Sequence, residues 1–452
     1  MTDSPHRRRR TTLPRGVRAA ARNLGWLLGT RGVIAVLSLV YLGIATRTLG
    51  VVNFGRFALI NGAVQAIFTF VAFQTWQIVV RYGVDHILAE DDAALARLLR
   101  GCLVLDAVSA LIGSGIAVAV LEVGRDRFGI TPDMMRLTLL YAVVQLVTIR
   151  STAVGILRLR DKFSLAALAD SMQPIMRFVG CAAAAFLMPT VTGFLLAWGA
   201  AEIVTAGTYW LMIVRTGDMA LIARGRIDRR QLLRENPNLT RFALSTNVTS
   251  TLGLSSKQVP LLLVGAYVGT AAAGAFRLAF QIAQALTKLS QLLSRAAFPE
   301  IVRAVRSPET RNLSRMLTRV FLYSVAAAVV ILALVAAAGH PILQLVGGDE
   351  FRYGRTVMMW MAAAGCLDLA VVSFEPVLMA AHRSGTALVA RTISSIVLVG
   401  ATVFLLPRVG TAGAGMGMMA GSLTAAVLLG WAVIRFARGA GGRPAVEERS
   451  PN

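Results

Sequence analysis

GWLLGTRGVIAVLSLVYLGIATRT, residues 25–48, is an apolar stretch long enough to cross a bilayer as one helix. A bilayer core of roughly 30 Å requires about 20 helical residues, and in lipid only helices or closed barrels satisfy every backbone polar group. Eleven similar stretches follow, at 57–80, 98–120, 136–157, 165–188, 192–214, 242–264, 272–294, 317–338, 355–380, 386–406 and 412–435. We therefore predict an all-α polytopic membrane protein with about 12 transmembrane helices.

Basic residues are distributed unevenly between the two sides of these stretches. The chain has 46 Lys and Arg against 23 Asp and Glu, a net charge of +23. The two tails and every second loop, with the adjoining span ends, hold 32 of the 46, whereas the opposite loops hold eight. The eight are Arg47, Arg56, Arg125, Arg127, Arg136, Arg352, Arg355 and Arg408. The positive-inside rule then places both termini in the cytoplasm of a bacterial inner membrane. The charge lies beside anionic lipid headgroups, so no nucleic acid is expected as a partner.

The chain shows no pattern of a cleaved leader, a disulfide framework or a metal site. The basic tail 1–24 precedes an apolar run that is too long for a signal peptide, so we expect a retained first helix. Cys102, Cys181 and Cys366 are isolated within predicted spans. The four histidines have no ligand spacing. No metal and no cofactor are predicted.

The longest basic loop, 215–241, divides the chain into two halves of six spans. We predict an N-lobe over 25–214, a C-lobe over 242–435 and a cytoplasmic tail over 436–452. A short pattern, Gly-x4-Gly-x-Phe-x-Leu, recurs at 50–59 and 269–278, with Gln65 and Gln284 at the same offset. Six helices per copy give both copies one orientation, so we expect pseudo-symmetric lobes around a central cavity.

The segment Arg47-Thr-Leu-Gly-Val-Val-Asn-Phe-Gly-Arg-Phe-Ala-Leu59 resembles the opening signature of the polysaccharide-export flippases. These belong to the multidrug/oligosaccharidyl-lipid/polysaccharide exporter superfamily. Phe298-Pro-Glu-Ile301 is similar to that family's Phe-Pro step. The resemblance implies translocation of an undecaprenyl-diphosphate-linked oligosaccharide from the cytoplasmic to the periplasmic leaflet. It implies membrane lipids and a polysaccharide polymerase or assembly proteins as further partners. Many relatives carry an acid in helix seven where this chain reads Lys257-Gln-Val-Pro260, so no coupling role is transferred there.

Eleven charged residues lie inside the predicted spans. The basic ones are Arg31, Arg150, Arg177, Lys257, Arg277 and Lys288, and the acidic ones are Asp106, Asp170, Glu202, Asp368 and Glu375. A basic residue at a helix centre costs about 2.5–3.5 kcal/mol. These groups must therefore pair or face a wet internal cavity.

A desolvated diphosphate requires charge-assisted donors. We predict substrate-binding roles for Arg31, Lys257, Arg277, Arg177 and Lys288. No phosphate-binding loop is present, so the drive must come from an ion gradient, the membrane potential or substrate consumption. Asp170, Glu202, Asp368 and Glu375 are the candidates for ion coupling.

Simpler interpretations exist for two pairs of charges. Asp170 and Arg177 share one face of a helix with Gln173 and could form an internal ion pair. Arg150 and Asp106 lie near predicted span ends, where snorkelling to the cytoplasmic surface explains them.

Three other functions compete with an oligosaccharide flippase. A multidrug/cation antiporter of the same superfamily requires an acidic cavity, whereas six basic against five acidic residues favour an anionic cargo. A lipid II flippase carries a similar headgroup. A membrane glycosyltransferase or polysaccharide polymerase requires a sizeable soluble segment or periplasmic loop, and the loops here are short. We predict a transporter and not an enzyme, with no catalytic residue.

Overall fold

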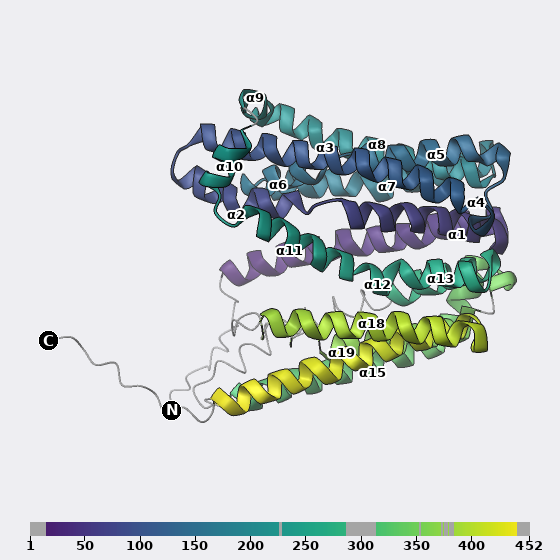
Figure 1. Ribbon diagram of the computed structural model, residues 1–452. Helices are drawn as coiled ribbons and strands as arrows, with labels where there is room; N and C mark the ends of the chain where they lie inside the picture. Colours follow the sequence, from purple (N-terminus) through teal and green to yellow (C-terminus); the bar gives the residue numbers. More distant parts are fainter. Residues whose placement is uncertain are drawn as a thin grey trace, which may run out of the picture.

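The computed structural model describes residues 15–225, 228–285, 313–351, 354–371, 374, 378 and 384–440. In this part of the chain the structure consists of helices joined by short turns (Figure 1). The first half contains α1 (Arg15–Val71), α2 (Thr75–Leu88), α3 (Asp92–Val123), α4 (Arg125–Phe128), α5 (Pro132–Val147), α6 (Ser151–Leu159), α7 (Phe163–Leu187) and α8 (Val191–Arg215).

The second half begins after two short helices, α9 (Asp218–Arg224) and α10 (Arg229–Glu235), which lie within the predicted inter-lobe loop. Three short helices then replace one predicted span: α11 (Leu239–Leu252), α12 (Leu254–Lys257) and α13 (Val259–Tyr267). Residues 270–285 are helical. The remaining elements are α15 (Leu313–Gly347), the 3-10 turn η1 (Asp349–Phe351), α16 (Gly354–Ala370), α18 (Ser384–Val409) and α19 (Thr411–Ala440).

The predicted fold class is confirmed. Among the described residues, seven helical segments are long and apolar enough to cross a membrane. Helices α3, α7, α8, α18 and α19 each cover a predicted span to within a few residues at either end. Pro132 at the start of α5 supplies a first-turn residue whose missing N–H costs nothing. The Phe-Pro step at 298–301 and both chain ends lie outside the described residues.

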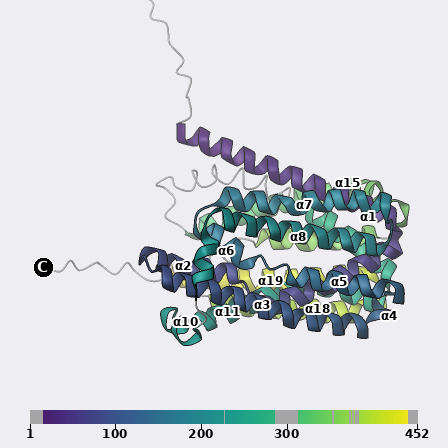
Figure 2. The same cartoon turned by 90° about the horizontal axis from the view of Figure 1, so that it is seen from above.

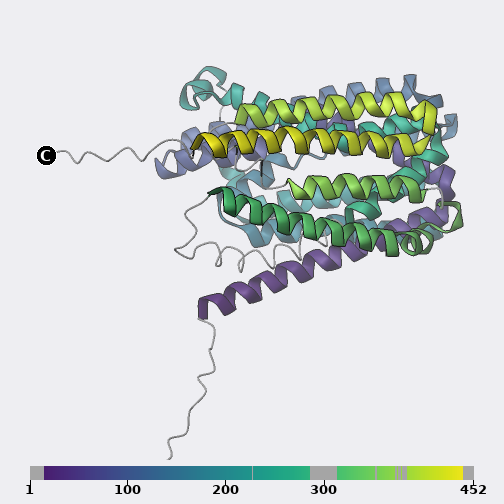
Figure 3. The same cartoon turned by 90° about the horizontal axis from the view of Figure 1, so that it is seen from below.

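The helices of each half are grouped together. Figure 1 shows α1 to α8 in the upper part of the view and α15, α18 and α19 in the lower part, with α11, α12 and α13 between them. Helices α7 and α8 lie side by side (Figure 2), as do α18 and α19 (Figure 3). One buried core joins the two halves, with Phe57 and Trp198 from the first and Phe276 and Phe351 from the second.

Several predicted spans differ in detail. Spans one and two form α1, which is kinked at Gly50 with φ +68°, a conformation that favours glycine. Spans 57–80 and 136–157 are each interrupted, by non-helical residues 72–74 and 148–150. Helix α15 continues beyond predicted span nine, 317–338, as far as Gly347. The first part of the predicted loop after this span is therefore helical.

Close packing of small residues joins helices in both halves. Lipid gives no hydrophobic drive for helix association, so small side chains that let backbones approach are favoured. A Cβ at Gly415 would lie 2.8 Å from Trp360 Cβ, and one at Gly421 would lie 2.6 Å from Leu398 Cβ. Glycines of α19 therefore let it pack closely against α16 and α18.

The two copies of the short repeat meet each other in space. A Cβ on Gly55 would lie 2.6 Å from the carbonyl carbon of Thr270, and one on Gly274 would lie 3.0 Å from the backbone nitrogen of Gly55. Gly55 and Gly274 occupy the same position in their copies. The repeat therefore marks the point at which the helices of the two halves cross backbone to backbone.

Hydrogen bonds close the same end of the molecule. They join α1 to the last turn of α15 and to η1, on either side of the Gly50 kink. The bonds run from Thr46 Oγ1 to Val346 O (2.9 Å), from Arg47 Nη2 to Leu345 O (2.6 Å) and from Val51 N to Glu350 Oε2 (3.0 Å). Two of these acceptors are helix-terminal carbonyls that have no partner within their own helix.

Candidate functional site

A buried carboxylate, Glu202 on α8, gathers donors from two other elements. Only 2% of the residue is exposed. Its Oε2 accepts a hydrogen bond from Arg150 Nη1 at 2.6 Å. Its Oε1 accepts from Arg177 Nη2 at 2.9 Å and from Gln173 Nε2. Gln173 and Arg177 lie on α7, whereas Arg150 lies in the break between α5 and α6.

Helical spacing explains why these side chains converge. Gln173 and Arg177 are four residues apart and so share one face of α7. Trp198 and Glu202 have the same spacing on α8. The Arg177 guanidinium lies over the Trp198 ring, 5.3 Å from its centroid, and the Tyr41 ring packs edge-on against Trp198 at 5.5 Å. Aromatic faces stabilise a desolvated cation.

A third arginine approaches from the second half of the chain. Arg277, on helix 270–285, lies within electrostatic range of Arg177 and of the phenols of Tyr41 and Tyr141. We call Arg150, Arg177, Arg277 and Glu202 the arginine cluster. Three cations and one carboxylate leave it with two excess positive charges. Like charges that are partly shielded from water repel one another, so the cluster favours an anion.

Two polar atoms beside this cluster are buried and have no hydrogen-bond partner among the described residues. They are Arg177 Nε and Tyr141 Oη. An unpaired buried polar group costs about 1–3 kcal/mol, and native proteins seldom retain one without a reason. Both groups can donate a hydrogen bond to a bound anion.

The predicted substrate-binding residues are only partly brought together. Arg177 and Arg277 lie in the arginine cluster. Lys257 is exposed on α12 and forms no hydrogen bond or ion pair with any residue in the described part of the chain. Arg31 lies within α1, but its side chain is outside the described residues, as is all of Lys288.

The predicted coupling carboxylates lie in different places. Asp170 accepts a hydrogen bond from Tyr209 Oη at 2.5 Å. Asp368 on α16 accepts one from Ser422 and lies within electrostatic range of Arg391. Glu202 belongs to the arginine cluster, and Glu375 is outside the described residues.

The predicted ion pair between Asp170 and Arg177 is wrong. Seven residues of helix separate their backbones by about 10 Å along the axis. Arg177 instead pairs with Glu202 on the neighbouring helix. Sequence spacing showed that the two residues share a face, but it could not show which helix lies opposite that face.

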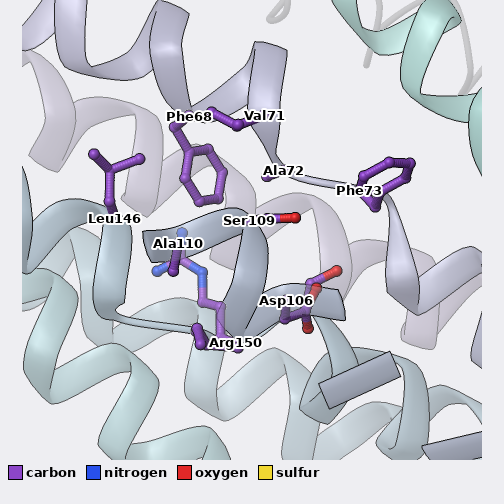
Figure 4. Close-up of a pocket in the computed structure, with 11 residues that line it drawn as sticks. Phe68, Val71, Ala72, Phe73, Asp106, Ser109, Ala110, Leu146 and Arg150 are labelled. Atoms are coloured by element: carbon purple, nitrogen blue, oxygen red, sulfur yellow. The ribbon is translucent and has the colours of Figure 1, made fainter. Parts of the chain in front are cut away.

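The interpretation of Asp106 and Arg150 as snorkelling residues is also wrong. Asp106 is 7% exposed and accepts hydrogen bonds from the hydroxyls of Thr75 and Thr152. Arg150 donates to Glu202. Both line a small cavity of about 30 Å³ at the level of the two helix breaks (Figure 4). The breaks carry no sequence signal, since neither contains proline or glycine.

Known proteins with this fold are membrane transporters. The structure resembles an inward-facing multidrug resistance MATE family transporter of the MOP superfamily, with a TM-score of 0.64 and 16% identity over 91% of this chain and 96% of that one. It resembles the lipid II flippase MurJ in an inward closed conformation equally well, with a TM-score of 0.64 and 12% identity over 89% of this chain and 87% of that one. The chain therefore has the MOP-superfamily fold, as the sequence predicted.

Sequence comparison gives the family within that class. The family model described as polysaccharide biosynthesis protein matches residues 20–305, more than half of the chain. The chain belongs to this family. It is also 26% identical to the inner membrane protein YghQ of Escherichia coli (strain K12) over 335 residues, which is 74% of this chain and 94% of that protein. Seven described helical segments are apolar and long enough to cross a membrane, so the chain is a multi-pass membrane protein of this family.

Proposed function

We propose that this protein is a flippase that moves an undecaprenyl-diphosphate-linked oligosaccharide from the cytoplasmic to the periplasmic leaflet. The observation that supports this proposal most directly is the half-buried excess of two positive charges in the arginine cluster. A diphosphate diester carries two negative charges and would neutralise them. Membership of the polysaccharide biosynthesis family supports a glycan-related cargo, and the fold shared with a lipid II flippase supports a lipid-linked one.

The geometry of the cluster suits a diphosphate. Arginine presents a planar fork of donors that matches phosphate oxygens, and these charge-assisted bonds strengthen away from water. Arg177 lies in the first half of the chain and Arg277 in the second. A diphosphate bound to both would bridge the halves and relieve the repulsion between the two arginines. Rocking of the lobes 25–214 and 242–435 would then move the headgroup between leaflets while the polyprenyl tail stays in lipid.

The positive charge of the arginine cluster distinguishes a flippase for an anionic lipid from a multidrug antiporter. A cationic drug would be repelled by the two excess positive charges, which disfavours a multidrug antiporter. A lipid II flippase would use the same diphosphate chemistry, so the cluster favours both flippases equally. Translocation requires no covalent step, and we propose none.

The proposed drive is an ion gradient that acts through Asp368. Glu202 is held by two arginines and a glutamine, so its role is to balance the charge of the cluster. Asp368 shares its region with a hydroxyl donor, Ser422, and a cation, Arg391. We propose that the Asp368 carboxylate, beside these two partners, binds and releases the coupling ion.

The test measures diphosphate binding and polysaccharide export with matched variants. Binding of farnesyl diphosphate, a soluble isoprenyl diphosphate, is measured on the purified full-length protein. Each charge-assisted contact contributes about 1.5–3 kcal/mol, so Arg177→Ala and Arg277→Ala should each weaken binding by about ten- to a hundredfold. Arg277→Lys keeps the charge but loses the fork and should recover only part of it. Arg230→Ala, on the exposed face of α10, is the control.

Export is measured by complementation of a strain that lacks its polysaccharide flippase, with protein abundance checked by blotting. Arg177→Ala and Arg277→Ala should fail to restore export at normal abundance, while Arg230→Ala restores it. Normal binding and normal export from a well-expressed double variant, Arg177→Ala with Arg277→Ala, would rule out the diphosphate site.

A further inference from the structure

Two neighbouring transmembrane helices are interrupted at the same level. Residues 72–74 separate α1 from α2, and residues 148–150 separate α5 from α6. Helices α2 and α6 lie in contact. Sharp helix breaks usually arise at proline, at Gly/Ser pairs or where a side chain inserts into the hydrogen-bond ladder. Ala72-Phe-Gln74 and Thr148-Ile-Arg150 contain no proline or glycine, so a tertiary contact must hold both breaks.

Asn247 donates to Ala72 O at the first break and Trp210 donates to Ile149 O at the second, but Asp106 on α3 contacts the helices that follow both breaks. Its carboxylate accepts hydrogen bonds from Thr75 Oγ1 at 2.9 Å, from Thr152 Oγ1 at 2.6 Å and from Thr152 N at 3.2 Å. Thr75 is the first residue of α2, and Thr152 is the second of α6. Both threonines are fully buried. The carboxylate thus contacts the first turns of two half-helices at once, and it caps the backbone N–H of Thr152 in the second.

The N-termini of α2 and α6 also balance the negative charge of Asp106. Asp106 forms no ion pair with any residue that the structure describes, although it lies inside a transmembrane helix. Each helix N-terminus carries roughly half a positive charge, so two of them balance one carboxylate. A hydrogen bond from the backbone N–H of Trp76 to Ser151 Oγ, at 3.2 Å, joins the first turns of α2 and α6.

The second break sets the direction in which Arg150 points. Arg150 is the last residue of the second break and the residue that precedes α6. Successive side chains of a continuous α-helix point about 100° apart. Because residues 148–150 are not helical, the Arg150 side chain points in a direction that a continuous helix would not give it. From this position Arg150 lines the cavity beside Asp106 (Figure 4) and reaches Glu202 Oε2 at 2.6 Å.

We propose that Asp106 is a positioning residue, which fixes the start of α6 and thereby directs Arg150 into the arginine cluster. This inference rests on the proposed function of that cluster. Asp106 does not touch the anion. It acts through Arg150, which contributes one of the three positive charges.

A double-mutant cycle tests the coupling, with farnesyl diphosphate binding to the purified full-length protein as the readout. Asp106→Asn and Arg150→Ala should each weaken binding about tenfold. Because Asp106 acts through Arg150, the double variant should also lose about tenfold, rather than the hundredfold expected of independent sites. Ser109→Ala, which lines the same cavity without bonding either break, is the matched control.

A second variant covers the case in which Asp106→Asn does not fold. Thr152→Val keeps the carboxylate and removes one hydroxyl donor, and it should weaken binding in the same non-additive way with Arg150→Ala. Multiplied effects in either cycle, or full binding by a folded Asp106→Asn, would overturn the positioning role.

Hydrogen–deuterium exchange separates failure of this inference from failure of the proposed function. Asp106→Asn should accelerate amide exchange over 150–157 about tenfold, because the Thr152 amide loses its charged acceptor, whereas Ser109→Ala should not. If Arg177→Ala leaves diphosphate binding unchanged, the proposed function fails and exchange alone decides the positioning role. Equal exchange in Asp106→Asn and wild type would then overturn it.

Discussion

The crossing of Gly55 and Gly274 makes the closed end of the molecule sensitive to a single methyl group. In Gly55→Ala the new Cβ would overlap the carbonyl oxygen of Thr270 and lie 2.6 Å from its carbonyl carbon. Non-bonded carbon atoms are most stable about 3.5–4.0 Å apart, so the helices must separate by at least roughly 1 Å. The obstacle is backbone, which cannot rotate away as a side chain would.

Overpacking of this kind costs about 1–3 kcal/mol. The cost applies only while the two halves are in contact, so Gly55→Ala should shift the equilibrium away from this closed state by about 5- to 150-fold. Gly274→Ala should act in the same direction. Gly115→Ala and Gly207→Ala are matched controls, since a Cβ at either would meet nothing within 4 Å.

The assay is a distance distribution between spin labels in lipid nanodiscs. Labels at Val52 and Leu345, which are 42% and 71% exposed, report on the closed end in a background without the three native cysteines. Wild type and both controls should show a dominant short distance, and Gly55→Ala and Gly274→Ala a longer one. Identical distributions in all five proteins would refute a tight crossing as the determinant of closure.

Three further predictions concern topology, coupling and the closed end. In a cysteine-free background, Asp349→Cys should react with an impermeant thiol reagent added from outside, and Arg230→Cys only after lysis; the reverse pattern would overturn the orientation. Asp368→Asn should change the pH or sodium dependence of flipping at unchanged abundance, and loss of abundance alone would mean a structural role. Glu350→Gln weakens a charged acceptor of the Val51 amide and, at this exposed site, should open the closed end by about 1 kcal/mol or roughly fivefold, measured with the same spin labels.

The sequence alone determined the class of architecture. Hydrophobic length and the absence of water in the bilayer leave a membrane chain few alternatives, so the bounds of α7 and α8 followed from composition. The repeat that contains Gly55 and Gly274 predicted two related halves, because the same pattern recurs at the same place in each half. The two arginines of greatest interest, Arg177 and Arg277, were identified because buried charge is costly in any fold.

Only the tertiary structure decided which charges meet. Helical periodicity shows the face on which Arg177 lies, but the partner on that face depends on how α7 packs against α8. Glu202 pairs with Arg150 and Arg177, and Asp170 accepts a hydrogen bond from Tyr209 instead of pairing with Arg177. The two helix breaks were not predictable, because the side chains that contact them, such as Asp106, Trp210 and Asn247, are distant in sequence. Local sequence sets periodicity and length, whereas a contact such as that of Asp106 exists only once three helices have packed.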